Sequence, residues 1–221
     1  MQVDPPLAPS APDVPEQLDA RQLEGAALRG ERFEEILVDG GDLSGEPGHD
    51  LRLDRVRLRD VALSSVAARG FRLGDGVVTD GDWSNADLQS STLDRVQASG
   101  IRATGANFSD GDLTDVVFES CRLDLASFRL ARLTRVVFRD CRLDDADFYG
   151  ANLSSVSFED SSLPRASFDA AVFARSEIRS CDLTDLGGVE RLTGVRIGVP
   201  ELMQIAAQLA NAHGIAVVQE E

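Results

Sequence analysis

An apolar residue at every fifth position, from Leu53 to Leu183 without a change of frame, is the feature that most constrains this chain. These 27 consecutive positions are called centres below. A second set, two residues before each centre, is uncharged and mostly small, as at Ala86, Ala106 and Cys121. The other three positions of each unit hold most of the charged and polar residues. A repeat this strict decides the fold, because single units cannot bury their apolar residues without stacking.

Neither common secondary structure has this period, because a helix repeats at 3.6 residues and a strand at two. Apolar residues at a centre and two positions before it, followed by polar residues, describe a very short strand and then a bend. Repeated bends coil the backbone, and successive coils can hydrogen-bond at the ordinary strand spacing of about 4.8 Å. The pattern therefore predicts an all-β solenoid with the centres inside.

Four units read Ala-(Asp/Asn)-(Leu/Phe)-x-x; they are 86–90, 106–110, 146–150 and 151–155. In these units the chain resembles the pentapeptide-repeat family, and the resemblance covers at least residues 51–185. It implies a right-handed quadrilateral β-helix with four pentapeptides per turn. The centres support four sides independently, because Phe and Leu alternate from Phe108 to Leu163 and would stack on opposite sides of a 20-residue coil.

The ends of the chain depart from the period. Residues 1–19 contain Pro5, Pro6, Pro9, Pro12 and Pro15 with several acids, and we expect a flexible tail because this segment has little to bury. Residues 20–185 form the predicted β-helix. Its opening coils, residues 20–50, are imperfect: they keep the frame at Leu23 and Leu28 but place Glu31 in an inward slot, and residues 46–50 are expected to bulge as a loop.

Residues 186–221 are expected to form a strand and a helix that cap the solenoid, since its last coil would otherwise leave unpaired edges. Pro200 suits the start of a helix and Gly214 its end. The apolar face consists of Leu202, Ile205, Ala206 and Leu209. Two interpretations stay open: this segment is a cap alone, or it is a cap that also forms a homodimer, as a similarly placed segment does in some family members.

The net charge of −16 is concentrated at the ends, with −9 in residues 1–50, so we expect no direct binding to nucleic acid, and none to membrane. Cys121, Cys141 and Cys181 occupy inward slots on one side. An odd number of buried cysteines and no secretory signal indicate free thiols in the cytoplasm.

No pattern of catalytic residues is present. His49 and His213 are the only two histidines, and neither has a nucleophile or metal-ligand pattern around it. The acids recur at outward repeat positions, where solvation is their ordinary role. We therefore expect a protein without enzymatic activity, metal or cofactor.

Two binding functions stay open. The first is a scaffold or adaptor for an unknown protein partner, docked on the one side whose outward residues sum to +2. The arginines proposed for this face are Arg52, Arg55, Arg72, Arg95, Arg132 and Arg135. The competing interpretation is that these arginines only pair with aspartates of neighbouring coils.

The second function is implied by the resemblance: family members inhibit or protect type II topoisomerases such as DNA gyrase, and their acidic rods are thought to mimic DNA. The segments Val195-Arg196-Ile197 and Ala212-His213-Gly214 resemble the end of the mycobacterial fluoroquinolone-resistance member. The other three sides sum only to −3, −2 and −2, so no continuous acidic stripe is expected.

Overall fold

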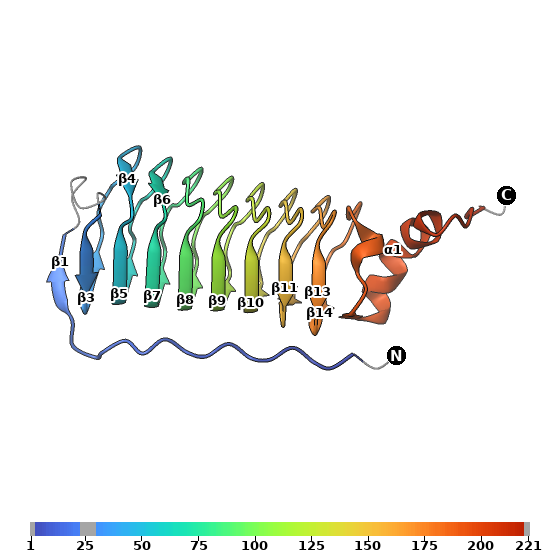
Figure 1. Ribbon diagram of the computed structural model, residues 1–221, viewed down its shortest axis with the longest axis horizontal. Helices are drawn as coiled ribbons and strands as arrows, with labels where there is room; N and C mark the ends of the chain where they lie inside the picture. The colour runs from blue at the N-terminus through green and yellow to red at the C-terminus, as the bar shows by residue number, and fades with distance from the viewer. Residues whose placement is uncertain (1–2, 23–29, 219–221) are drawn as a thin grey trace.

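The computed structural model describes residues 3–22 and 30–218, and these form a parallel β-solenoid that ends in one α-helix (Figure 1). Over residues 32–179, the strands pair in parallel at a spacing of 20 residues, so that Leu53 lies against Leu73 and Leu93 against Leu113. The spacing is shorter at the two ends, with Asp19 against Ile36 and Ser176 against Val195. One coil is therefore four pentapeptides. The predicted quadrilateral β-helix is confirmed.

Within the described residues, the strands belong to one 13-stranded sheet and one two-stranded sheet. The long strands of the 13-stranded sheet are β5 (Arg52–Arg59), β7 (Arg72–Thr79), β8 (Thr92–Ser99), β9 (Asp112–Glu119) and β10 (Arg132–Arg139). The shorter strands before them are β1 (Asp19–Arg21), β2 (Arg32–Glu34) and β3 (Ile36–Asp39). The two-stranded sheet consists of β4 (Pro47–His49) and β6 (Ala67–Arg69). The later ones are β11 (Asn152–Ser154), β12 (Ser157–Glu159), β13 (Val172–Ala174), β14 (Ser176–Arg179) and β15 (Val195–Ile197). The remaining sides of the coils are joined by single parallel bridges, such as Asp82 to Arg102.

The centres form one continuous core inside the coil. Phe118, Phe138 and Phe158 stack nearly parallel, with ring centroids 5.2 and 5.1 Å apart. The second phenylalanine column packs against them edge-on, for example Phe148 against Phe138 at 6.1 Å. Trp83 is buried and meets Phe71 edge-on at 6.2 Å, which agrees with a packing role.

The corners of the coil place ordinary residues in the left-handed backbone region, where φ of the non-glycine residues lies between 44° and 60°. One such residue ends each pentapeptide, two positions after its centre. Asp, Asn and Ser tolerate this conformation best, but Arg and Leu also occupy it, as at Arg95 and Leu125.

The opening coils are more regular than the sequence suggests. Residues 46–50 were expected to bulge as a loop, but residues 47–49 form β4, which pairs with β6 and places Gly48 opposite Ala68. A glycine can hold the position of a centre because the strand is fixed by its backbone bonds. Glu31 is exposed, and the predicted centres Leu23 and Leu28 lie outside the described residues.

Residues 3–17, called the N-terminal segment below, run as an extended chain beside the solenoid, from β1 back toward the opposite end (Figure 1). Strand β1 then joins the sheet by pairing with β3. This placement differs from the flexible tail expected for residues 1–19. The physical reason lies in backbone hydrogen bonds to the solenoid, described below.

Helix α1 (Val199–Ala212) closes the last coil, after a short 3₁₀ turn (Val189–Arg191) and β15. Ile205 is fully buried, and Leu209 packs against the end of the core. None of the described helices is long and apolar enough to cross a membrane.

Candidate partner-binding surface

At one corner of the solenoid, acidic residues and arginines alternate from coil to coil, with Ser155 as the one interruption. We call this column the corner ladder; it consists of Glu35, Arg55, Asp75, Arg95, Asp115, Arg135, Ser155 and Arg175. Its members lie 20 residues apart, and all of them have a left-handed backbone. Their side chains are therefore stacked along the rod, one coil spacing apart.

Ion pairs join the ladder in steps of one coil. The Arg95 guanidinium donates two hydrogen bonds of 2.7 Å to the Asp75 carboxylate, and Arg135 donates bonds of 2.6 and 2.8 Å to Asp115. Arg55 pairs with Glu35 at 2.7 Å. The bonds from Arg95 hold the pKa of Asp75 below its ordinary value, although burial opposes this shift. The expectation that these arginines pair across neighbouring coils is confirmed for these three.

The N-terminal segment lies on this corner. The backbone amide of Ser10 donates to Oδ1 of Asp115, and that of Asp13 donates to Oδ1 of Asp75, both at 2.9 Å. Toward the far end, Asp4 comes within 3.9 Å of Arg175. The N-terminal segment therefore binds along the corner ladder. Arg55, Arg95 and Arg135 are paired with carboxylates of the same ladder.

Burial sets this corner apart from the other corners. Asp75, Asp115 and Ser155 are only 7%, 6% and 3% exposed. Leu125 and Leu130, which occupy equivalent corner positions on other edges, are 61% and 59% exposed. Asp75 and Asp115 lie buried where leucines at other corners face solvent, because the N-terminal segment lies over this edge.

Beside the ladder, three arginines lie one above the other in register; we call Arg32, Arg52 and Arg72 the arginine stack. Arg32 approaches Glu34 at 3.6 Å and Asp54 at 3.9 Å. Arg52 and Arg72 are exposed, and no described carboxylate comes within ion-pair distance of either. A hollow of about 280 Å³ opens beside them, where Gly74 and Thr92 are small.

Arg132, the sixth predicted arginine, is exposed and pairs with Asp112 at 3.1 Å. Of the six, only Arg52 and Arg72 therefore keep free guanidinium groups with respect to the described residues. The other four, Arg55, Arg95, Arg132 and Arg135, each have a carboxylate within ion-pair distance.

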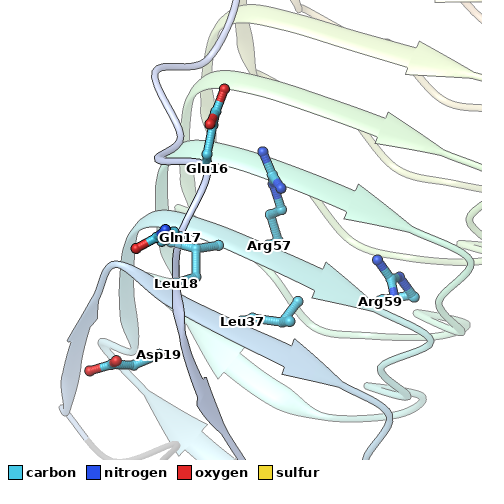
Figure 2. A pocket seen from close by; sticks show the side chains of 7 residues that line it. All are labelled: Glu16, Gln17, Leu18, Asp19, Leu37, Arg57 and Arg59. Atoms are coloured by element: carbon cyan, nitrogen blue, oxygen red, sulfur yellow. The ribbon is translucent and has the colours of Figure 1, made fainter.

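A larger hollow of about 600 Å³ lies where the N-terminal segment leaves the solenoid. Figure 2 shows Glu16, Gln17, Leu18 and Asp19 on one wall, and Leu37, Arg57 and Arg59 of strands β3 and β5 on the other. This hollow is open and polar. It marks the end of the contact between the segment and the coil.

The C-terminal cap uses two residues that the apolar spacing did not reveal. Oε1 of Gln204 accepts from the Leu183 amide at 2.8 Å, and Nε2 donates to the Cys181 carbonyl at 3.0 Å. Buried Glu201 accepts from the Cys181 amide at 3.3 Å. One carboxamide thus replaces one peptide group of the missing next coil.

The predicted cap or dimer residues divide between two environments. Ile205 is fully buried, and Ala206 and Leu209 are half-buried against the coil. Leu202 is 40% exposed, and it lines an apolar hollow of about 230 Å³ between α1, β15 and the 3₁₀ turn. The cap contacts are therefore in place.

The three cysteines are buried and free. Cys121 donates from Sγ to the Glu119 carbonyl at 3.3 Å, and burial raises the pKa of the Cys181 thiol to about 11. Over residues 3–22 and 30–218, no three His, Cys, Asp or Glu side chains gather in a way that could hold a metal ion.

Acidic side chains elsewhere on the rod are also interleaved with arginine. Glu159 lies between Arg139 and Arg179, at 3.1 and 3.7 Å. On the side opposite the ladder, Arg142 approaches Asp124 at 3.3 Å. The described surface therefore shows paired charges along several columns.

Comparison with known proteins places residues 111–186 in the family described as pentapeptide repeat region. No curated protein matches the chain. Among solved structures, full-length QnrB1, a plasmid-mediated fluoroquinolone resistance protein, is 17% identical with a TM-score of 0.54, and the match covers 87% of this chain and 98% of that one. HetL, involved in heterocyst differentiation regulation in the cyanobacterium Nostoc sp. strain PCC 7120, is 16% identical with a TM-score of 0.38, and the match covers 72% of this chain and 89% of that one. At such identities QnrB1 shares the fold, and nothing finer follows from the likeness.

Proposed function

Because the chain is a pentapeptide-repeat protein, we propose that it acts as a non-catalytic scaffold that docks a protein partner on the arginine stack. The observation that carries this proposal is the exposure of Arg52 and Arg72 without described carboxylate partners. Like charges stacked about 4.8 Å apart repel one another, and an acidic surface would relieve that repulsion. The partner is therefore expected to present carboxylates.

Charge reversal tests this function. Arg52→Glu/Arg72→Glu should reduce recovery of a stoichiometric partner in a pull-down from the source organism by about tenfold or more, since each interfacial pair contributes on the order of 1 kcal/mol or more. The matched control is Arg122→Glu, an exposed arginine on the opposite side of the coil. Equal recovery with the double variant and the control would contradict docking at the arginine stack.

A second candidate is binding to a type II topoisomerase such as DNA gyrase. The resemblance to the family implies it, and the fold shared with a fluoroquinolone resistance protein motivates the test. The paired charges of the rod speak against DNA mimicry, because a mimic should present a continuous negative field. A supercoiling assay decides: no effect of micromolar protein on gyrase, with or without quinolone, refutes this candidate.

For the C-terminal segment we propose a homodimer in addition to the cap. Val199 and Met203 are 73% and 70% exposed on α1, and the chain after the helix leaves Ile215 and Val217 exposed. Sedimentation should show a dimer that Leu202→Asp/Met203→Asp converts to a monomer, while Leu130→Asp on the rod has no effect. A monomer at all concentrations of the unmodified chain would refute this.

The free thiols favour a reducing compartment, and we propose the cytoplasm.

A further inference from the structure

The N-terminal segment meets the corner ladder with a regular spacing. Its two donors, the amides of Ser10 and Asp13, are three residues apart. Their acceptors, Asp115 and Asp75, are 40 residues apart and therefore separated by two coils. The segment runs antiparallel to the direction in which the coils are added.

Two independent periods coincide here. Three residues of polyproline II helix advance about 9.3 Å. Two coils advance about 9.6 Å at the strand spacing. Because aspartate and arginine alternate from Asp75 to Arg135, the two aspartate acceptors are also two coils apart. An extended segment can therefore repeat the same contact along the rod without losing register.

The sequence of the segment carries the same period. Pro6, Pro9, Pro12 and Pro15 lie three residues apart, and each hydrogen-bonding residue directly follows a proline. Proline favours the polyproline II conformation and offers no amide that would need a partner. Such a segment loses little conformational entropy on docking.

The arginines of the ladder orient the aspartate carboxylates that accept hydrogen bonds from the segment. Oδ1 of Asp115 accepts both from Nε of Arg135 at 2.6 Å and from the Ser10 amide at 2.9 Å. Asp75 is held in the same way between Arg95 and the Asp13 amide. Paired guanidinium groups fix each carboxylate while leaving room for one more donor, and hydrogen bonds to ionised acceptors are the stronger kind.

We propose that the corner ladder is a recognition site for polyproline II segments with a proline at every third residue, and that residues 6–16 of the chain are its resident, displaceable occupant. This goes beyond docking at the arginine stack. The ladder is a separate column, and its ligand offers backbone amides in place of carboxylates. Substitutions in the segment leave Arg52 and Arg72 intact, so that either proposal can fail alone.

The test uses the full chain and a fluorescein-labelled peptide of residues 3–17. In Ser10→Pro/Asp13→Pro both amide donors are lost while the polyproline II conformation is kept, so the resident segment should leave the ladder. The peptide should then bind in fluorescence polarisation with a dissociation constant of roughly 0.1–1 mM. Binding to the unmodified chain should be at least about tenfold weaker, because the tethered segment competes at an effective concentration in the millimolar range.

The matched control is Ala11→Pro/Val14→Pro, which adds the same number of prolines at positions whose amides donate no hydrogen bond to a described residue. It should behave like the unmodified chain. Failure of the peptide to bind the folded Ser10→Pro/Asp13→Pro chain, or equal binding to all three chains, would overturn the proposal.

Hydrogen exchange of the unmodified chain gives a second test that needs no variant. The amides of Ser10 and Asp13 should exchange at least about tenfold more slowly than those of Ala11 and Val14, relative to their rates in the free peptide. Equal relative rates at all four positions would also overturn the proposal.

Discussion

The carboxamide of Gln204 stands in for a peptide group of an absent coil, and its removal has a predictable cost. Within the rod, the Leu163 amide donates to the Asp182 carbonyl at 2.8 Å, and the Asp182 amide donates to the Ser161 carbonyl at 3.1 Å. At the last coil, the Leu183 amide and the Cys181 carbonyl find the same two partners in Gln204. Gln204→Ala leaves both groups without them.

The expected loss is about 1–2 kcal/mol. A net hydrogen bond contributes about 0.5–1.5 kcal/mol. The lower part of the range for two bonds applies, because Gln204 is exposed and water can reach the freed groups. Gln204→Glu should lose at least as much, since it keeps the acceptor but directs a second oxygen at the Cys181 carbonyl.

Gln208→Ala is the matched control, one turn further along α1. Oε1 of Gln208 is buried and has no hydrogen-bond partner among the described residues, so its removal should be neutral or slightly stabilising. Both substitutions replace a glutamine of α1 by alanine. Only the role of the carboxamide differs.

Hydrogen exchange measured residue by residue is the appropriate assay, because stability in a solenoid is set by nearest-neighbour contacts. Exchange of the Leu183 amide should accelerate about tenfold in Gln204→Ala, the equivalent of about 1.4 kcal/mol. The denaturant midpoint reported by Trp83 fluorescence should not change, because position 83 lies 100 residues upstream of position 183. Equal exchange of Leu183 in Gln204→Ala and Gln208→Ala would refute the capping role.

Three further predictions concern the core, the ladder and the thiols. Phe138→Ala should lower the free energy of unfolding by about 3–5 kcal/mol, measured by urea denaturation, because Phe138 is fully buried between stacked rings. Phe138→Leu, which keeps much of the apolar volume, should lose clearly less, and a loss equal to that of Phe138→Ala would contradict the cavity as the main cause. The Asp75 carboxyl has a pKa lowered by Arg95 and by the Asp13 amide, so its stabilisation is present above about pH 4 and lost as the pH falls through the lowered folded value. Protection of the Asp13 amide should accordingly be constant from pH 7 to 5 after correction for intrinsic exchange, and a loss within that range would contradict this assignment. Because burial raises the pKa of Cys181 to about 11, a thiol reagent at pH 8 should label it at least about a hundredfold more slowly in the native chain than in urea, and comparable rates would show an open core.

The solenoid could be predicted from the sequence because every coil repeats the same pattern of apolar and polar residues. The period indicates which residues face inward. The alternation of Phe and Leu centres agrees with the 20-residue turn that the family resemblance implies. The opening unit at Pro47–His49 could not be predicted in the same way. It lacks an apolar centre, and its strand is held by backbone bonds that side-chain patterns do not report.

The arginine-rich face was predicted only in part. Counting charges by side finds Arg52 and Arg95 equally, but the pairing of Arg95 with Asp75 depends on the coil-to-coil distance. The role of the cap residues Glu201 and Gln204 was missed, because the apolar spacing of a helix says nothing about polar side chains that replace backbone groups. The N-terminal segment was missed because composition treats its prolines as a sign of disorder. Their three-residue spacing was the available signal.

The match between three residues of the segment and two coils of the rod couples their lengths. Deleting or duplicating one coil between Asp75 and Asp115 would shift the later members of the ladder by one step and place an arginine where the Ser10 amide needs a carboxylate. A gain or loss of two coils, together with one proline triplet, would restore the register. The length of the N-terminal segment is therefore coupled to the length of the solenoid. In descendants with longer or shorter solenoids, we expect the solenoid to change in units of 40 residues and the segment to change with it in units of three.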